Sequence, residues 1–177
     1  MIKMKDFAII YSSKTGNTKK IAEAFYAAAA DRCDLIDVKE AGDVGKYKVV
    51  FAGYWVDRGA PNAEMQKFLS SLQNMRVVFF QTLGAEPYSE HGMTCFANAG
   101  KFLTSNCNVL GVFSCRGAID PALIAAMEKM PAGSPHAPTP ESRKRWQDAS
   151  THPDDKDIDS AKAYMQKFIA FYDKFYH

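Results

Sequence analysis

The sequence predicts a three-layer α/β fold in which a five-stranded parallel sheet is doubly wound, with helices on both faces. Three observations favour this fold. Short apolar runs alternate with segments of helical periodicity over the first two-thirds of the chain. The first apolar run leads directly into a loop rich in hydroxyl side chains. The length of 177 residues suits one core, so we expect residues 1–177 to form a single domain.

The five strands are predicted from short runs of apolar, β-branched and aromatic residues. They cover residues 7–11, 35–38, 48–53, 76–81 and 108–113. Runs of this kind are typical of parallel strands that are covered on both faces. The expected order across the sheet places the second strand at one edge, followed by the first, third, fourth and fifth.

Helices are predicted where apolar residues recur at spacings of three and four. The first helix covers about residues 17–30, the second carries Pro61 in its first turn, and the third covers about residues 90–103. A long amphipathic helix ends the chain, and its apolar stripe should pack on the sheet as the last layer. The stripe consists of Ile158, Ala161, Met165, Phe168, Tyr172 and Phe175.

Residues 114–153 interrupt this rhythm and are interpreted as an inserted segment. Asp120-Pro121 and Thr139-Pro140 each place a capping residue before a proline, which predicts two short helices. The proline-rich residues 131–138 between them do not favour regular structure. Because segments this long inside compact domains are usually functional or disordered, we expect the insert to cover the rim of the ligand site and to contribute to partner binding or self-association.

Composition excludes several classes of function. The net charge is only +2 and no basic stripe carries interleaved aromatics, so we predict no nucleic-acid binding. No apolar run is long enough to span a bilayer and no signal peptide is recognisable, so we expect a cytoplasmic protein without membrane insertion. The four cysteines are scattered singly, which predicts reduced thiols and no metal site.

The most informative segment follows the first strand and reads Ser12-Ser13-Lys14-Thr15-Gly16-Asn17-Thr18. A loop between a strand and a helix N-terminus offers unpaired N–H groups and the positive end of the helix dipole, and the side chains can complete a phosphate shell. The segment has neither the Gly-x-x-x-x-Gly-Lys-Ser/Thr pattern nor the three glycines of the dinucleotide fingerprint. It therefore predicts a terminal phosphate that is held and not transferred, as in a mononucleotide cofactor.

The run S-x-T-G-N-T after an N-terminal strand resembles the phosphate site of the flavodoxin family, whose cofactor is flavin mononucleotide (FMN). The resemblance covers the whole chain except the insert. It implies a flavodoxin-like fold and one bound FMN. It also implies that the phosphate is held by side chains of four residues and by backbone N–H groups of two others, namely Ser13, Thr15, Asn17 and Thr18, and Lys14 and Gly16. A polar helix cap without a ligand is the alternative.

The flavin ring is expected beyond the carboxyl ends of the strands, between the loops that follow the third and fourth strands. The candidate ring residues are Tyr54, Trp55, Val56, Asp57, Arg58 and Gly59 in the first loop, and Thr82, Leu83, Gly84 and Tyr88 in the second. Trp55 or Tyr54 on one side and Tyr88 on the other are candidates for aromatic stacking on the ring. For each of these aromatics, ordinary hydrophobic packing is the alternative.

Two residues of the first loop are expected to influence the flavin. Gly59 lets a peptide turn its carbonyl toward the N5 side of the ring, because positive φ costs glycine little; Gly53 is the alternative. Arg58 places a cation where many flavodoxins keep acidic or neutral residues, and the nearly neutral chain also differs from those acidic carriers. We expect Arg58 to raise the potential of the reduced flavin, unless its side chain points into solvent.

We therefore expect an FMN-binding electron carrier that shuttles electrons to or from a redox partner protein such as a reductase, rather than a stand-alone oxidoreductase. No catalytic residue is predicted, because the histidines are isolated and only His91 lies near a flavin loop. An NAD(P)H-dependent FMN or quinone reductase on the same fold is the alternative. An accessory subunit that uses the fold without flavin is a third reading, and a homodimer is left open.

Overall fold

The computed structural model describes residues 3–176 and contains the predicted doubly wound α/β sheet. Its parallel strands are β1 (Phe7–Tyr11), β2 (Cys33–Asp37), β3 (Val49–Asp57), β5 (Arg76–Leu83) and β6 (Asn108–Arg116). They lie in the order β2-β1-β3-β5-β6, which confirms the predicted order. A two-residue strand, β4 (Ala60–Pro61), pairs antiparallel with the end of β3 and was not predicted.

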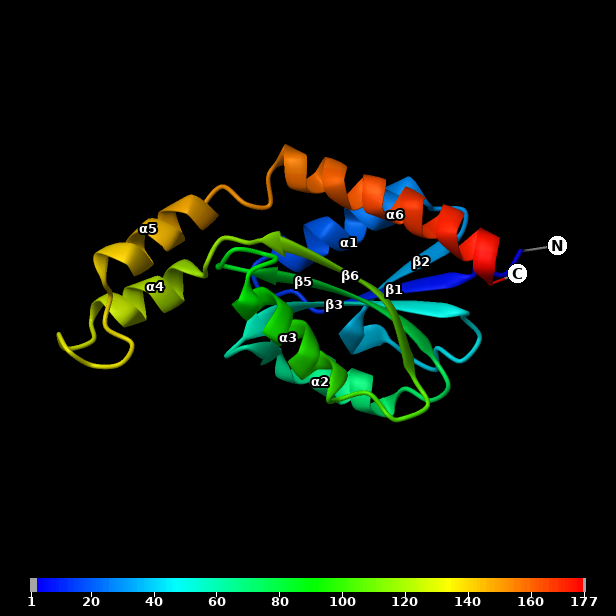
Figure 1. The fold of residues 1–177 in the computed structure, drawn as a ribbon, viewed down its shortest axis with the longest axis horizontal. Helices are drawn as coiled ribbons and strands as arrows, with labels where there is room; N and C mark the ends of the chain where they lie inside the picture. The colour runs from blue at the N-terminus through cyan, green and yellow to red at the C-terminus, as the bar shows by residue number, and fades with distance from the viewer. Residues whose placement is uncertain (1–2, 177) are drawn as a thin grey trace.

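Helices cover both faces of the sheet, as Figure 1 shows. One face is covered by α1 (Asn17–Ala28) and α6 (Asp155–Phe175). The other face is covered by α2 (Ala63–Ser71) and α3 (Glu90–Gly100). A short 3-10 helix, η1 (Val38–Glu40), follows β2. The two helices predicted in the insert are present as α4 (Pro121–Glu128) and α5 (Pro140–Ala149).

The central strands are buried on both faces because consecutive side chains of a strand point in opposite directions. In β1, Phe7 and Ile9 join the core beneath α1 and α6, whereas Ala8 and Ile10 join the core beside α2 and α3. All four side chains are 0% exposed. This two-sided burial explains why the strands are continuous apolar runs in the sequence and not alternating ones.

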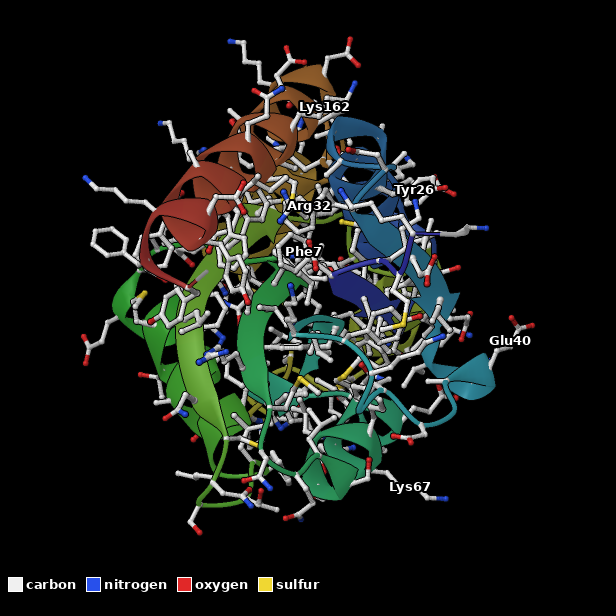
Figure 2. The ribbon with its side chains drawn as sticks, turned by 90° about the vertical axis from the view of Figure 1, so that its right-hand side faces the viewer. Phe7, Tyr26, Arg32, Glu40, Lys67 and Lys162 are labelled. Atoms are coloured by element: carbon white, nitrogen blue, oxygen red, sulfur yellow. The ribbon has the colours of Figure 1, made fainter. Side chains whose placement is uncertain are left out.

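Arg32 fastens the amino end of the sheet to the last helix. Its guanidinium donates to Asp6 at 2.8 Å and to both carboxylate oxygens of Asp173 at 3.2 and 2.9 Å. It also lies 5.1 Å from the ring centre of Phe7, and the two residues are close together in Figure 2. Hydrogen bonding to Asp173 and Asp6 raises the pKa of Arg32 above its ordinary value. This clamp lies at the end of β1 opposite the hydroxyl-rich loop.

The helices α4 and α5 project from the sheet as an arm, which is plain in Figure 1. No residue of α4 is buried, and Ala149 is the one buried residue of α5. The Arg143 guanidinium joins the two helices through hydrogen bonds of 2.9 and 2.8 Å to the carboxylate of Glu128. At the base of the arm, the Ala118 N–H donates to the His152 carbonyl at 2.9 Å. The arm therefore leaves and rejoins the core at one place.

Most predicted boundaries are shifted by a few residues, and two of the differences affect the surroundings of the site. Pro61 does not lie in the first turn of a helix: it belongs to β4, and Asn62 is the residue before α2. The reason is that β3 continues to Asp57 and turns back on itself, so that Pro61 pairs with Val56. Likewise β6 continues to Arg116 because its ladder with β5 extends that far, so the inserted arm begins after residue 116.

Replacing Gly53 by alanine should destabilise the fold, because a Cβ at this position of β3 would lie 1.9 Å from the ring of Phe80. Overpacking of this kind costs about 1–3 kcal/mol. Urea unfolding should therefore show a lower midpoint with an unchanged m-value. Gly42→Ala is the matched control, since a Cβ there meets nothing within 4 Å. Equal stability of the two variants would contradict the close packing of β3 on Phe80.

Candidate functional site

The loop after β1 is shaped by one glycine and one hydroxyl. Gly16 precedes α1 with a φ of 97°, a left-handed conformation that favours glycine. The Ser13 hydroxyl accepts hydrogen bonds from the N–H groups of Gly16 at 3.1 Å and Lys19 at 3.3 Å. Ser13 therefore stabilises the loop internally, and the loop reaches α1 in a fixed conformation.

Several donors of this loop lack a partner within the protein. Among residues 3–176, no acceptor is assigned to the backbone N–H groups of Lys14, Thr15, Asn17 and Thr18. These groups lie at the N-terminus of α1, where the helix dipole adds positive potential. Such an arrangement is suited to a phosphate.

Two of the predicted phosphate side chains are occupied by contacts within the protein. The Thr18 hydroxyl is 1% exposed and lies 2.9 Å from the hydroxyl of Thr82 on β5. The Asn17 side chain donates to the Ala118 carbonyl at 2.9 Å. These two hydrogen bonds connect the loop to β5 and to the segment after β6. Thr15 is exposed and is the loop threonine that lines the neighbouring cavity.

A cavity of about 350 Å³, here called the strand-end cavity, lies beyond the carboxyl ends of the central strands. It brings the phosphate loop together with residues from both predicted ring loops and from the inserted segment. Its lining consists of Lys14, Thr15, Trp55, Val56, Asp57, Arg58, Thr82, Leu83, Gly84, Gly117, Ala118, Ile119, Asp120 and Leu123. Residues of the inserted segment thus line the same cavity as the predicted ring loops. That the insert covers the rim of a flavin site and contributes to partner binding or self-association stays a prediction.

The structure does not bring every candidate residue to the strand-end cavity. Tyr54 is fully buried in the core and its hydroxyl donates to Gln81 Oε1 at 3.1 Å. The Tyr88 hydroxyl instead accepts the N–H of Ser114 on β6 at 3.0 Å. Gly53 is buried within β3. Trp55 is thus the aromatic side chain on the wall of the cavity, because neighbouring strand residues point to opposite faces.

Arg58 and Gly59 form the turn between β3 and β4. Their φ angles are 52° and 77°, so both central residues of this two-residue hairpin are left-handed, as in a type I′ turn. The Asn98 side chain on α3 donates to the Gly59 carbonyl at 2.8 Å. The turn is therefore attached to α3, and the exposed Arg58 side chain lines the cavity.

Sequence reasoning expected the insert to lie at the rim of the site but named none of the residues directly after β6 as part of it. A Cβ on Gly117 would lie 2.9 Å from Asn17 Nδ2, so glycine permits the close approach to the phosphate loop. Lys14 Nζ forms a 3.0 Å ion pair with Asp120 and lies 5.8 Å from the ring centre of Trp55. Hydrogen bonds from Lys14 and from the Ala122 N–H hold the pKa of the Asp120 carboxyl below its usual value. The glycine directly after the last strand was the available signal.

Comparison with known proteins places the chain in a family. The model of the flavodoxin domain matches residues 8–166. The chain belongs to the flavodoxin family. A relative, the flavodoxin-like domain-containing protein BilS of Clostridioides difficile (strain CD3), is 30% identical over 166 residues, which cover 91% of this chain and 94% of the relative. The predicted family is thereby confirmed, and so is FMN as the cofactor that this family binds.

Two solved structures show that this flavodoxin shares its fold with more distant proteins. A flavodoxin from the domain Archaea has a TM-score of 0.54 at 16% identity, covering 92% of this chain and 94% of its own. A flavoprotein from Lactobacillus acidophilus NCFM in complex with FMN has a TM-score of 0.52 at 18% identity, covering 70% of this chain and 98% of its own. Separately, none of the helices within residues 3–176 has the length and apolar character needed to cross a membrane.

The buried hydroxyl pair between α1 and β5 is testable by a double-variant cycle. Thr18→Val should lower the free energy of unfolding by about 1–3 kcal/mol, because the buried Thr82 hydroxyl loses its partner. The double variant Thr18→Val/Thr82→Val should be less destabilised than the sum of the two single variants, since neither hydroxyl is left alone. Strictly additive losses in urea unfolding would show that the two hydroxyls do not interact.

Proposed function

We propose that this flavodoxin is an electron carrier that exchanges electrons with a reductase partner through one bound FMN. The observation that carries the proposal is the joint opening of the phosphate loop and the Trp55 wall into one strand-end cavity. FMN supplies one- and two-electron redox chemistry, and the protein has to bind it and tune its electrostatics. The carrier role, the cytoplasmic location and the single domain stay predictions, and a homodimer stays open.

In this proposal, the phosphate is held by the unpaired N–H groups of the loop and by the Thr15 hydroxyl. Ser13, Asn17 and Thr18 act indirectly, because their side chains fix the conformation of the loop and its distance from β5 and β6. Trp55 offers an indole for stacking on the flavin ring. Lys14 already lies beside Trp55 and Asp120, so its cation is available near both the phosphate and the ring.

A carrier role is supported by the surroundings of the cavity. His91 lies outside the strand-end cavity, with Nε2 3.8 Å from Cys95 Sγ. His91, the histidine near a predicted flavin loop, instead lines the adjoining hollow. On the rim, Leu123 of α4 is 52% exposed beside the cavity. An exposed apolar side chain at the edge of a redox site suits transient contact with a partner protein.

FMN binding tests the assigned phosphate site directly. Titration of the apoprotein, followed by quenching of FMN fluorescence, should give one FMN per chain. Thr15→Val should weaken binding by about 1–3 kcal/mol, which is roughly 5- to 150-fold, because a phosphate oxygen loses a hydroxyl donor. Thr94→Val on α3 is the control, since its hydroxyl bonds the Glu90 carbonyl within the helix. An affinity that Thr15→Val leaves unchanged would remove Thr15 from the phosphate site.

The carrier and reductase hypotheses differ in steady-state behaviour. The FMN-loaded protein alone should not oxidise NADPH with a quinone acceptor, whereas adding a flavodoxin reductase should allow electrons to pass through it. The loss of NADPH absorbance measures the first reaction, and stopped-flow absorbance at the flavin bands measures the second. Sustained NADPH oxidation by the protein alone would favour the NAD(P)H-dependent FMN or quinone reductase instead.

Arg58 should raise the potential at which FMN takes up its second electron. Full reduction leaves negative charge on the ring, and a guanidinium several ångströms away stabilises it by roughly 1 kcal/mol at an effective dielectric near 20. Because about 2.3 kcal/mol corresponds to 100 mV, Arg58→Gln should lower this potential by roughly 40 mV at low ionic strength. Lys67→Gln on α2 is the control, outside the cavity. Equal potentials in both variants would assign Arg58 to another role.

A further inference from the structure

The strand-end cavity continues into a second hollow of about 440 Å³, here called the arginine groove. The two hollows share Val56, Arg58, Leu83, Gly84 and Ile119 in their walls. The arginine groove therefore adjoins the proposed place of the flavin ring and shares part of its wall. It is completed by residues from three separate elements, namely Gly59 of the β3–β4 turn, His91 of α3, and Arg145 and Trp146 of α5.

The groove is positively charged. Arg58 and Arg145 line it, and its lining within the described residues contains no carboxylate. Neither guanidinium forms an ion pair among residues 3–176, although Glu141 lies one turn before Arg145 on α5. The neighbouring cations of α5 behave differently, since Arg143 pairs with Glu128 at 2.8 Å and Lys144 pairs with Asp148 at 2.9 Å. Arg58 and Arg145 thus line the groove without an ion pair, although the charge of Arg145 interacts electrostatically with the Glu141 carboxylate.

Both guanidinium groups come from fixed backbone. Arg58 lies in the left-handed turn whose next residue, Gly59, is held by Asn98. Arg145 lies on α5, which begins with a capping box at Thr139 and Ser142 and is joined to α4 through Arg143. A guanidinium recognises a carboxylate or sulfonate through two parallel hydrogen bonds. The groove therefore presents two anion-binding forks at prearranged places.

Apart from its two arginines, the groove is lined mainly by an indole ring and by aliphatic side chains. Trp146 is half-buried and contributes an indole, and Ile119, Val56 and Leu83 contribute aliphatic surface. An indole favours a planar conjugated ring by stacking. We infer that the arginine groove binds a planar, conjugated small molecule that carries anionic groups such as carboxylates, next to the FMN site.

The groove offers indole and aliphatic surface beside its two guanidinium groups. This combination suits an anionic small molecule with a ring system better than the acidic face of a protein, whose carboxylates would use the arginines alone. The assignment also gives the insert a specific task, because Arg145 and Trp146 both belong to it. The inference concerns binding only and goes beyond the proposed carrier role. Its test uses oxidised protein without electron transfer, so failure of the carrier hypothesis would not change the outcome.

The probe is anthraquinone-2-sulfonate, which is planar and anionic, and 2-(hydroxymethyl)anthraquinone is its neutral counterpart. Calorimetric titration of the FMN-loaded protein should show saturable one-to-one binding of the sulfonate. Arg145→Gln should weaken this binding at least fivefold, Arg58→Gln similarly, and added salt should weaken it in the wild type. The neutral compound should bind more weakly than the sulfonate, and neither Arg145→Gln nor Arg58→Gln should change its affinity. Trp146→Leu should weaken both compounds.

Lys144→Gln is the matched control, because Lys144 precedes Arg145 on α5 but does not line the groove. It should leave the affinity for the sulfonate unchanged. Circular dichroism and FMN content establish that each variant is folded and loaded. The inference would be overturned if Arg145→Gln bound the sulfonate as tightly as the wild type. It would also be overturned if Lys144→Gln lost as much affinity as Arg145→Gln.

Two further outcomes would also overturn it. If the FMN-free protein binds the sulfonate and the loaded protein does not, the groove belongs to the cofactor site. If the sulfonate does not bind, while Arg145→Gln slows electron exchange with a reductase and Lys144→Gln does not, the arginines recognise an acidic protein surface instead.

Discussion

The site depends on the burial of the central strands on both faces. Side chains of β1 are divided between two cores, and neither face is open to a ligand. Parallel strands all point the same way, so their carboxyl ends form one edge where the chain must turn into loops. The hydroxyl-rich loop, the β3–β4 turn and the segment after β6 meet at this edge for that reason.

Three polar contacts then fix the phosphate loop relative to its neighbours. Thr18 meets Thr82 of β5, Asn17 meets the Ala118 carbonyl, and Lys14 pairs with Asp120. A loop held in this way has little conformational entropy left to lose when a phosphate binds. In the proposed function, the side chains that resemble phosphate ligands in the sequence have two roles: Thr15 donates directly, and Ser13, Asn17 and Thr18 preorganise the loop.

The fold could be predicted because its evidence is local. The apolar run of residues 7–11 and the S-x-T-G-N-T pattern each lie within a few consecutive residues. The placement of the aromatics could not be predicted in the same way. Whether Tyr54 or Trp55 faces the cavity depends on how far β3 extends, and this follows from its pairing with β4. The position of the Tyr88 side chain depends on its hydrogen bond with Ser114 on β6, which is distant in sequence.

The arm formed by α4 and α5 is inserted between β6 and α6 and belongs to neither the sheet nor the helices that cover it. Because the Ala118 N–H meets the His152 carbonyl, residues 119–151 begin and end at neighbouring points of the core. The entropy of closing such a loop changes only slowly with its length. Descendants of this sequence can therefore lengthen, shorten or exchange the arm without altering the sheet or α6. The part of the arm beyond Leu123 can therefore vary, while Ile119, Asp120 and Leu123 at its base keep their places in the wall of the strand-end cavity.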